Sequence, residues 1–407
     1  MRVLMVTPGT RGDVAPMAGL GKKLQEHGFA VSIAANAVHA PLITSAGCDY
    51  HELPGDMSAL VSPAAPGAKP SASQLSWYMR ELGAYFDSAA TGTLEAAEQG
   101  ADVIIANSVA PYAYDVAEAF GIPVIGAHLQ PNEPSTAYAP MVLGTARSFG
   151  ALGNKALGSL IGSGKAPYDA PVARIRAALG LPKRTRASGE RQRRRANAPV
   201  LHGFSSSIVP RPADWRSGLS NCGYWWPASD EAWTPPSALA DFLAEGPAPI
   251  FIGFGSTEAL DPEFMLDVAR RSGRRAILQG APEISEPGIL GIGAAPHQWL
   301  FPQMAAVIHH AGAGTTAAGL RAGVPTIAVP IFTDQPFWAA RVHALGAGVE
   351  PVKYKDLSVD RLASAIDQTL STDHYAANAS RIARLLAEEE DSSLPVARAL
   401  REAAAAR

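Results

Sequence analysis

The sequence predicts an α/β protein built from two parallel-sheet lobes. In the first 127 residues, short apolar runs with strand character alternate with helical patterns, which is typical of a parallel sheet covered by helices. A second alternation of the same kind begins at Pro249, after a segment rich in Pro and Trp. At 407 residues the chain is long enough to bury two hydrophobic cores.

Each element of the first lobe follows from a local pattern. Apolar runs predict strands at 2–7, 30–34, 49–53, 102–106, 123–127 and 199–205. Apolar residues at helical spacing predict helices at 14–27, 74–99 and 111–120. Residues 57–73, rich in Pro, Ala, Gly and Ser, are expected to form a surface loop, and residues 129–170 are expected to form helices and loops that line a cleft.

Two segments interrupt the alternation of strands and helices. Residues 183–195 hold seven basic residues and one acid, and we expect a solvated or disordered loop rather than a nucleic-acid or lipid-headgroup patch. Residues 208–237 contain four tryptophans, which are costly to leave in water, so this linker should pack against both lobes. The predicted division is an N-terminal lobe 1–207, a linker 208–237, a C-terminal lobe 238–375 and C-terminal helices 376–407.

The second lobe repeats the alternation. Its predicted strands are 249–254, 275–278, 288–292, 306–308 and 326–329, and its predicted helices are 262–272, 315–321, 359–370, 375–390 and 394–407.

A glycine turn joins the predicted strand 306–308 to the helix at 315–321. Gly312 and Gly314 let the backbone approach a ligand closely, and the start of the helix presents unpaired N–H groups with a partial positive charge, which suits a phosphate. The spacing does not fit the Gly-x-Gly-x-x-Gly pattern of dinucleotide binding, and no P-loop lysine follows. The polar side chains of His310 and Thr315 flank the glycines instead.

Asp334 and Gln335 follow the next strand, at the end where open parallel sheets place ligands. Carboxylate and amide groups suit the hydroxyls of a sugar. A phosphate site followed by a polyol site indicates a nucleotide sugar.

These motifs together resemble those of a known enzyme family. His310-Ala-Gly-Ala-Gly-Thr315 followed by Asp334-Gln-Pro336 is similar to the sugar-donor signature of nucleotide-sugar-dependent glycosyltransferases with the two-lobed B fold. The longer strings, with Arg211-Pro-Ala-Asp-Trp215 and Gly223-Tyr-Trp-Trp226, most resemble the sterol and antibiotic (glycopeptide- and rifamycin-type) branch. The resemblance implies two Rossmann-like lobes that face each other across a cleft, with the last helices crossing back to the first lobe.

Asp13 is the candidate general base. It lies in Gly12-Asp13-Val-Ala-Pro16 after the first strand, and from the residues alone it could simply be the N-cap of the helix predicted at 14–27. The resemblance favours catalysis, because related enzymes place their base at this position. An acceptor hydroxyl is a weak nucleophile and needs a group that takes its proton as the new bond forms.

The other site residues are assigned by position and by the resemblance. Diphosphate contacts are expected from Thr10, Ser256, His310, Gly312, Gly314 and Thr315. Nucleoside contacts are expected from His297 and Gln298, which follow the strand that comes before 306–308 in the chain. Trp77, Tyr78, Tyr112, His128 and Tyr138 are the candidate walls of the acceptor cleft.

No metal or tightly bound cofactor is expected. The chain has no Asp-x-Asp pair to hold a divalent ion against a diphosphate, and adjacent histidines such as His309 and His310 point apart at the end of a strand. Family members commonly carry glycine where this chain has Ala311, and because alanine disfavours φ above zero, we expect this position to be unstrained.

The bulk properties narrow the class of protein. A net charge of −3 gives no global attraction to nucleic acid, no run of 18 apolar residues predicts a membrane span, and no signal peptide is apparent, so a cytoplasmic enzyme is expected. Cys48 and Cys222 are too few for a disulfide framework.

The predicted function is an inverting glycosyltransferase that moves a hexose from a UDP- or dTDP-sugar to a hydroxyl of a hydrophobic small molecule. An epimerase of the same fold and a non-catalytic sugar-nucleotide-binding protein are the alternatives.

Overall fold

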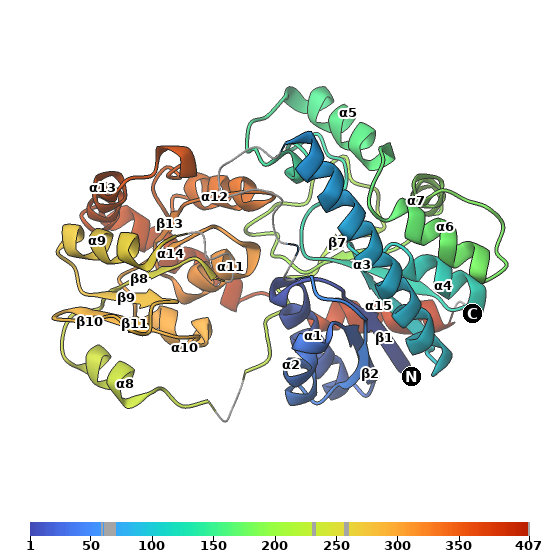
Figure 1. Cartoon of the computed structure of the whole chain (residues 1–407), viewed down its shortest axis with the longest axis horizontal. Coiled ribbons are helices and arrows are strands. Elements are labelled where there is room, and N and C mark those ends of the chain that lie inside the picture. The colour runs from blue at the N-terminus through green and yellow to red at the C-terminus, as the bar shows by residue number, and fades with distance from the viewer. Residues whose placement is uncertain (58–59, 61–70, 230–232, 256–259, 406–407) are drawn as a thin grey trace.

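Two α/β lobes lie side by side in the computed structural model, which describes residues 1–57, 60, 71–229, 233–255 and 260–405 (Figure 1). The first lobe has a seven-stranded parallel sheet in the order β3-β2-β1-β4-β5-β6-β7. The second lobe has a six-stranded sheet in the order β10-β11-β9-β8-β12-β13, in which only the β10–β11 pair is antiparallel. The prediction of two parallel-sheet lobes is confirmed.

The strands of the first sheet are β1 (Arg2–Val6), β2 (Ala30–Ala35), β3 (Asp49–Glu52), β4 (Val103–Asn107), β5 (Val124–His128), β6 (Val200–His202) and β7 (Leu219–Asn221). Those of the second sheet are β8 (Ile250–Gly253), β9 (Ala276–Gln279), β10 (Ser285–Glu286), β11 (Ile289–Ile292), β12 (Ala306–His309) and β13 (Thr326–Ala328).

The helices are α1 (Arg11–Glu26), α2 (Ala40–Ser45), α3 (Ala72–Glu98), α4 (Ala113–Phe120), α5 (Gly150–Ser163), α6 (Asp169–Ala178), α7 (Arg186–Arg195), α8 (Ser237–Ala244), α9 (Pro262–Ser272), α10 (His297–Leu300), α11 (Ala313–Ala322), α12 (Gln335–Ala344), α13 (Val359–Leu370), α14 (Asp373–Ala387) and α15 (Ser393–Ala405).

Helices cover both faces of the first sheet. Along β1, Val3 and Met5 point into a core that α1 and α15 share, while Leu4 and Val6 point into a second core under α3. Helix α15, at the end of the chain, therefore crosses back onto the first lobe, as the resemblance implied (Figure 1). Helix α14 packs against α11 of the second lobe, so among the described helices at the end of the chain it is α15 that lies on the first sheet.

The predicted linker does more than connect the lobes. The strand predicted at 199–205 was expected to be the last of the first lobe, but β7 follows it within 208–237 and forms the edge of the first sheet. A strand of three residues is too short to show a period in the sequence. The linker tryptophan Trp215 shares a buried cluster with Phe204 of the first lobe and with Phe337 and Trp338 of the second, which confirms that this segment packs against both lobes.

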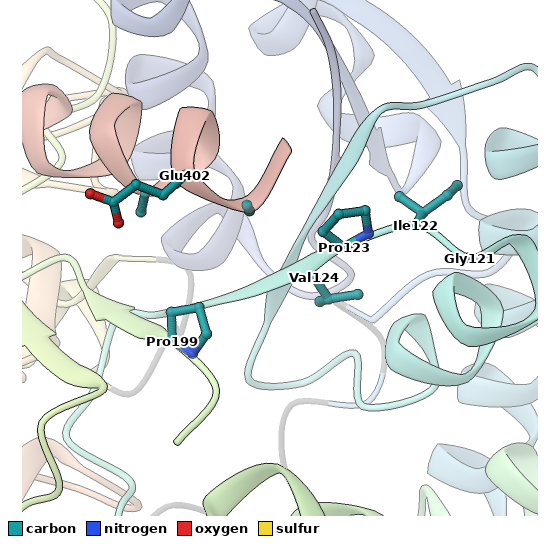
Figure 2. A pocket seen from close by; sticks show the side chains of 8 residues that line it. Gly121, Ile122, Pro123, Val124, Pro199 and Glu402 are labelled. Carbon is teal, nitrogen blue, oxygen red and sulfur yellow. The ribbon is translucent and has the colours of Figure 1, made fainter. Parts of the chain in front are cut away.

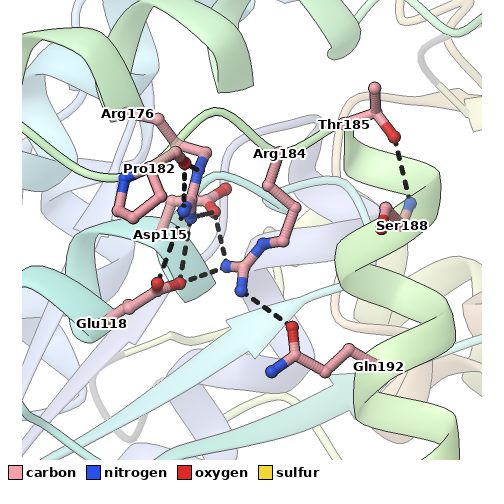
Figure 3. A network of polar contacts seen from close by, with 8 residues as sticks. All are labelled: Asp115, Glu118, Arg176, Pro182, Arg184, Thr185, Ser188 and Gln192. Carbon is pink, nitrogen blue, oxygen red and sulfur yellow. Dashed lines mark hydrogen bonds and ion pairs between the residues drawn. The ribbon is translucent and has the colours of Figure 1, made fainter.

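The basic run 183–195 is not a solvated or disordered loop, so that prediction was wrong. Most of it forms helix α7, whose N-cap hydroxyl, on Thr185, accepts the N–H of Ser188 at 3.2 Å. Three of its arginines, Arg184, Arg186 and Arg194, pair with carboxylates of the first lobe, which bring the run against α4 and α6. Other basic residues of the run, Lys183, Arg191 and Arg195, are exposed. At the centre of this network, two arginines meet two carboxylates: Arg176 and Arg184 with Asp115 and Glu118 (Figure 3).

Candidate active site

The predicted phosphate turn lies at the carboxyl edge of the second sheet. Strand β12 ends at His309, Gly312 is the N-cap residue of α11, and the helix begins at Ala313. The N–H groups of the first helical turn have no acceptor within the helix and lie at the positive end of its dipole. The predicted order of strand, turn and helix is confirmed, and phosphate binding by Gly312, Gly314 and Thr315 stays a prediction.

The ring of His310 lies between two glycines. A Cβ atom at Gly312 would lie 2.6 Å from Nε2 of this ring, and one at Gly255, just after the neighbouring strand β8, would lie 3.2 Å from Cε1. Burial lowers the pKa of His310 to about 4, so the imidazole is neutral at physiological pH. Ser256, predicted to contact the diphosphate from the same loop, lies outside the described residues.

Ala311 was expected to be unstrained, and that expectation was wrong. Its φ is 62°, in the left-handed region that favours glycine, and the residue is fully buried. The turn from β12 into α11 requires this conformation. The N–H of Ala311 donates to Nδ1 of His309 at 3.0 Å, which gives the turn a bond of its own.

Asp334 and Gln335 stand at the start of α12, after β13. The carboxylate of Asp334 accepts the indole N–H of Trp338 at 2.9 Å through Oδ2 and the hydroxyl of Thr333 at 3.1 Å through Oδ1. Gln335 is buried, and its Oε1 accepts the N–H of Ile331 at 2.8 Å, which closes the loop before the helix. Asp334 is therefore held in one orientation, while the Gln335 side chain supports the loop through its oxygen.

Asp13 lies in the first turn of α1, and Thr10, not Asp13, is the N-cap residue. Oδ2 of Asp13 accepts the backbone N–H of Thr10 at 3.0 Å and the Thr10 hydroxyl at 3.2 Å. Gly9 has a φ of 130°, and a Cβ atom there would lie 2.5 Å from the same oxygen, so the loop needs glycine at this position. The hydroxyl of Thr10, predicted to reach the diphosphate, is directed at Asp13 within its own lobe.

The pKa of Asp13 is raised from 3.8 to about 6. Burial is the main cause, and the negative field of Asp334 adds to it, while the two bonds from Thr10 act in the opposite direction. An ionised carboxylate with this pKa is a better proton acceptor near neutral pH than an ordinary aspartate. The field between Asp13 and Asp334 also indicates that the candidate residues of the two lobes face each other.

His297 and Gln298 begin helix α10, a few residues after β11. The ring of His297 stacks on Phe301, with centroids 4.3 Å apart and planes 13° from parallel. Its pKa is lowered to about 4, first by burial, then by the positive charge of Arg11 on the first lobe, and then by the repulsion that a second proton on the nearby His310 would cause. His297 therefore lies close to the phosphate turn, whereas Gln298 is exposed.

The five residues predicted to line the acceptor cleft have different surroundings. Tyr112 is completely buried in the core under α3, so its assignment to the cleft was wrong. Trp77 is 46% exposed on α3 and Tyr78, beside it, is half-buried. Tyr138 packs edge-on against Phe337 of the second lobe, with centroids 5.2 Å apart.

His128, the fifth of these residues, ends strand β5. Its ring meets that of His202, at the end of β6, edge-on at 5.7 Å, and Nδ1 of His128 has no hydrogen-bond partner within the described residues. Burial lowers the pKa of His128 to about 4, so this ring is neutral. It is a polar group at the same sheet edge as Asp13.

Three residues that the sequence did not single out hold the loop of Asp13. The N–H of Gly9 donates to the hydroxyl oxygen of Tyr85 at 3.1 Å, and this hydroxyl donates to Oδ1 of Asn36 at 2.6 Å. Nε2 of His39 lies 3.2 Å from the carbonyl oxygen of Gly9. These residues are 27 to 76 positions from Gly9 in the chain, and no local motif marks them.

A groove of about 500 Å³ lies on the far side of the first lobe. It is bounded by α15 and by the segments that lead into β5 and β6, including Pro123, Pro199 and Glu402 (Figure 2). These residues are at the amino ends of the strands, whereas the candidate residues are at the carboxyl ends. None of the predicted site residues lines this groove.

Within the part of the chain that the structure describes, no three His, Cys, Asp or Glu side chains gather as metal ligands. Among the same residues, no helix has the length and apolar character needed to cross a membrane.

Known proteins match the chain in both lobes. Residues 3–138 match the model of the glycosyltransferase family 28 N-terminal domain, and residues 257–400 match that of the erythromycin biosynthesis protein CIII-like C-terminal domain. The fold is similar to that of the solved glycosyltransferase VinC in complex with dTDP (TM-score 0.71, 18% identity, 100% of each chain) and of the calicheamicin glycosyltransferase CalG4 (TM-score 0.73, 15% identity, 100% of this chain and 98% of that one).

Two curated relatives illustrate the range of the family. The O-mycaminosyltylonolide 6-deoxyallosyltransferase of Streptomyces fradiae is 33% identical over 411 residues, which cover 96% of this chain and 94% of that protein. A sterol 3-beta-glucosyltransferase of Arabidopsis thaliana is 32% identical over 409 residues, which cover 96% of this chain but 64% of that protein. Both are transferases by name, so the epimerase alternative is not favoured. Because one relative is matched along nearly its whole length, the chain belongs to the glycosyltransferases that join a family 28 N-terminal domain to an erythromycin CIII-like C-terminal domain.

Proposed function

We propose that this glycosyltransferase moves a hexose, with inversion, from a UDP- or dTDP-sugar to a hydroxyl group of a hydrophobic small molecule. The proposal rests mainly on Asp13 of the first lobe, a buried carboxylate that feels the field of Asp334 of the second lobe, where the N-terminus of α11 also lies at the end of β12. Asp13 can take the proton of the acceptor, Asp334 can hold hydroxyls of the sugar, and the helix can hold the diphosphate.

In the proposed reaction, the acceptor oxygen attacks the anomeric carbon from the side opposite the diphosphate. Asp13 takes the proton of the hydroxyl as the new C–O bond forms, and the bond from the anomeric carbon to the diphosphate oxygen breaks. The departing diphosphate gains negative charge, which the N–H groups of Gly312 to Thr315 and the neutral His310 stabilise by donating hydrogen bonds. No step requires a metal ion, in keeping with the absence of an Asp-x-Asp pair from the sequence.

The choice of sugar donor and acceptor rests on similarity and on surface chemistry. Two similar solved structures were determined with thymidine diphosphate, and the relatives' names describe transfer of 6-deoxyallose to O-mycaminosyltylonolide and of glucose to a sterol. Near the sugar site, a Cβ atom at Gly144 would lie 3.8 Å from the backbone nitrogen of Thr333, so the loop before α5 reaches the second lobe. Exposed apolar residues gather on this loop and on α5, and they suit a hydrophobic acceptor: Val142, Leu143, Phe149, Leu152 and Leu160.

We also propose a cytoplasmic location. Cys48 and Cys222 are buried and unpaired, as is usual in a reducing compartment.

The test is a transfer assay with purified protein. UDP-glucose and dTDP-glucose are each offered with macrolide aglycones, sterols and flavonoids, and products are detected by mass spectrometry. The anomeric configuration of the product, read by NMR, tests inversion. Binding of UDP and dTDP without turnover of any acceptor would support the non-catalytic alternative instead.

A further inference from the structure

His309 is buried at the end of β12 and makes a bond that the proposed reaction has not used. Its Nδ1 accepts the N–H of Ala311 at 3.0 Å, so the ring is the neutral tautomer with its proton on Nε2. We propose that His309 is a positioning residue, which holds the turn between β12 and α11 in the shape that presents its N–H groups to a nucleoside diphosphate. This inference rests on the proposed function of the turn.

The bond acts on the strained residue of the turn. Ala311 has a φ of 62°, a conformation that an L-residue with a Cβ atom disfavours and that glycine adopts freely. A bond from a side chain to the backbone N–H two residues later is a local device that stabilises a turn. In this chain, His309 can thus stabilise a conformation that a glycine at position 311 would adopt without help.

The conformation of Ala311 decides where the groups of the diphosphate site point. Ala311 lies between His310, whose ring is wedged between Gly255 and Gly312, and the N-cap of α11. If Ala311 left the left-handed region, the ring of His310 and the first N–H groups of the helix would both turn. His309 itself is completely buried and acts only through this turn.

The surroundings of His309 keep its acceptor atom available. Burial lowers the pKa of His309 well below its ordinary value, and the nearby His310 and His297 lower it further. Nδ1 therefore stays unprotonated over the pH range in which the enzyme would work. The ring's Nε2–H has no partner within the described residues, so the bond to Ala311 is the polar contact that the structure gives this side chain.

A matched pair of substitutions separates this role from simple packing. The Oδ1 atom of asparagine is as many bonds from Cα as the Nδ1 atom of histidine and can accept the Ala311 N–H, whereas the acceptor of glutamine lies one bond further out. We expect His309→Asn to keep the affinity for UDP and dTDP, measured by calorimetry, within about threefold of the unmodified protein. We expect His309→Gln to weaken it by about tenfold, the effect of one lost hydrogen bond in a preorganised site.

Ala311→Gly supplies the second arm of the experiment. Glycine adopts the left-handed conformation without the bond, so this change should restore more nucleotide affinity in the His309→Gln protein than it adds to the unmodified protein or to His309→Asn. Strictly additive effects of the two changes, or equal losses in the Asn and Gln proteins, would overturn the proposal.

The measurements also separate this inference from the proposed function. If the unmodified protein bound neither UDP nor dTDP, the sugar-donor site itself would be wrong. If it bound them and His309→Gln bound equally well while remaining folded, the site would stand and the positioning role would fall. Thermal melting of each variant, followed by circular dichroism, shows whether a loss of affinity reflects unfolding.

Discussion

Replacing Asp13 with Asn should abolish most transfer while making the protein more stable. The pKa of Asp13 is raised from 3.8 to about 6, and each tenfold change in a proton equilibrium is worth about 1.4 kcal/mol. At neutral pH, the burial of the ionised Asp13 carboxylate therefore lowers the free energy of unfolding by at most about 3 kcal/mol. Asn has no charge to bury, and its Oδ1 can still accept the N–H of Thr10.

The size of this gain in stability depends on pH. Between pH 4 and pH 6 the folded protein holds a proton on Asp13 that the unfolded chain has lost, so stability falls as pH rises through this window and then stays level. The increase in the free energy of unfolding caused by Asp13→Asn should reach its full value at pH 8, be about half as large at pH 5, and be absent well below pH 4. With an unfolding entropy of about 2.1 cal/mol/K per residue over the whole chain, the melting midpoint should rise by at most about 4 °C at pH 8.

Activity should change in the opposite direction. A positioned general base contributes about 10²–10⁴-fold, so transfer to an aliphatic alcohol should fall by that factor in Asp13→Asn. Phenolic acceptors, with a pKa near 10 as in tyrosine, lose their proton more readily than alcohols do, so the rate of transfer to them should fall by a smaller factor. For the unmodified enzyme, kcat/KM should rise about tenfold per pH unit up to pH 6 and then level off as Asp13 becomes ionised.

Two assays test these predictions for Asp13→Asn. Scanning calorimetry at pH 5 and pH 8 measures the stability of both proteins, and initial rates with paired alcohol and phenol acceptors measure transfer. UDP and dTDP affinity serves as the control, because all the predicted nucleotide contacts except Thr10 lie in the other lobe. Full turnover of an aliphatic acceptor, together with equal melting midpoints at both pH values, would refute the reasoning and leave Asp13 with its helix-terminal bonds alone.

Four further results are expected. His310→Ala should weaken binding of UDP and dTDP in calorimetry by roughly 10–150-fold, the value of a hydrogen bond to a charged group, and unchanged binding would count against the site. Trp338→Phe removes the indole N–H that orients Asp334, so it should raise KM for the sugar nucleotide but leave the affinity for the free nucleoside diphosphate unchanged; equal losses of both would point to a general packing defect. Ala311→Gly should stabilise the second lobe by about 1 kcal/mol in thermal melting, and a lower midpoint would mean that the left-handed conformation is not strained. Transfer should persist in excess EDTA, and loss of activity that magnesium restores would refute metal-independent catalysis.

The sequence was sufficient where the structure depends on local patterns. Strand β12, the glycine turn and α11 could be predicted because an apolar run, two glycines and helical spacing follow one another within 17 residues. The neighbouring Asp334 could be placed because carboxyl ends of parallel strands share one edge.

The remainder depends on contacts between distant parts of the chain. The run that contains α7 was expected to be a solvated or disordered loop because a sequence shows the charges of its arginines but not the distant carboxylates, such as Asp169 and Glu133, that pair with them. Tyr112 was assigned to the cleft because the sequence does not show whether an aromatic residue after a strand faces a ligand or, as here, the core. The strain at Ala311 was missed because a turn can impose a backbone conformation that the residue itself disfavours.

The position of the last helix determines where the chains of two related enzymes can be joined when their lobes are exchanged. Helix α15 is last in the chain, yet Val396, Ala397 and Leu400 complete the core behind Val3 and Met5 of the first lobe. A hybrid joined only once, within the linker, would cover the first sheet of one parent with the last helix of the other. Hybrids that combine one enzyme's acceptor lobe with another's sugar-donor lobe should therefore be joined twice, in the linker and again between α14 and α15.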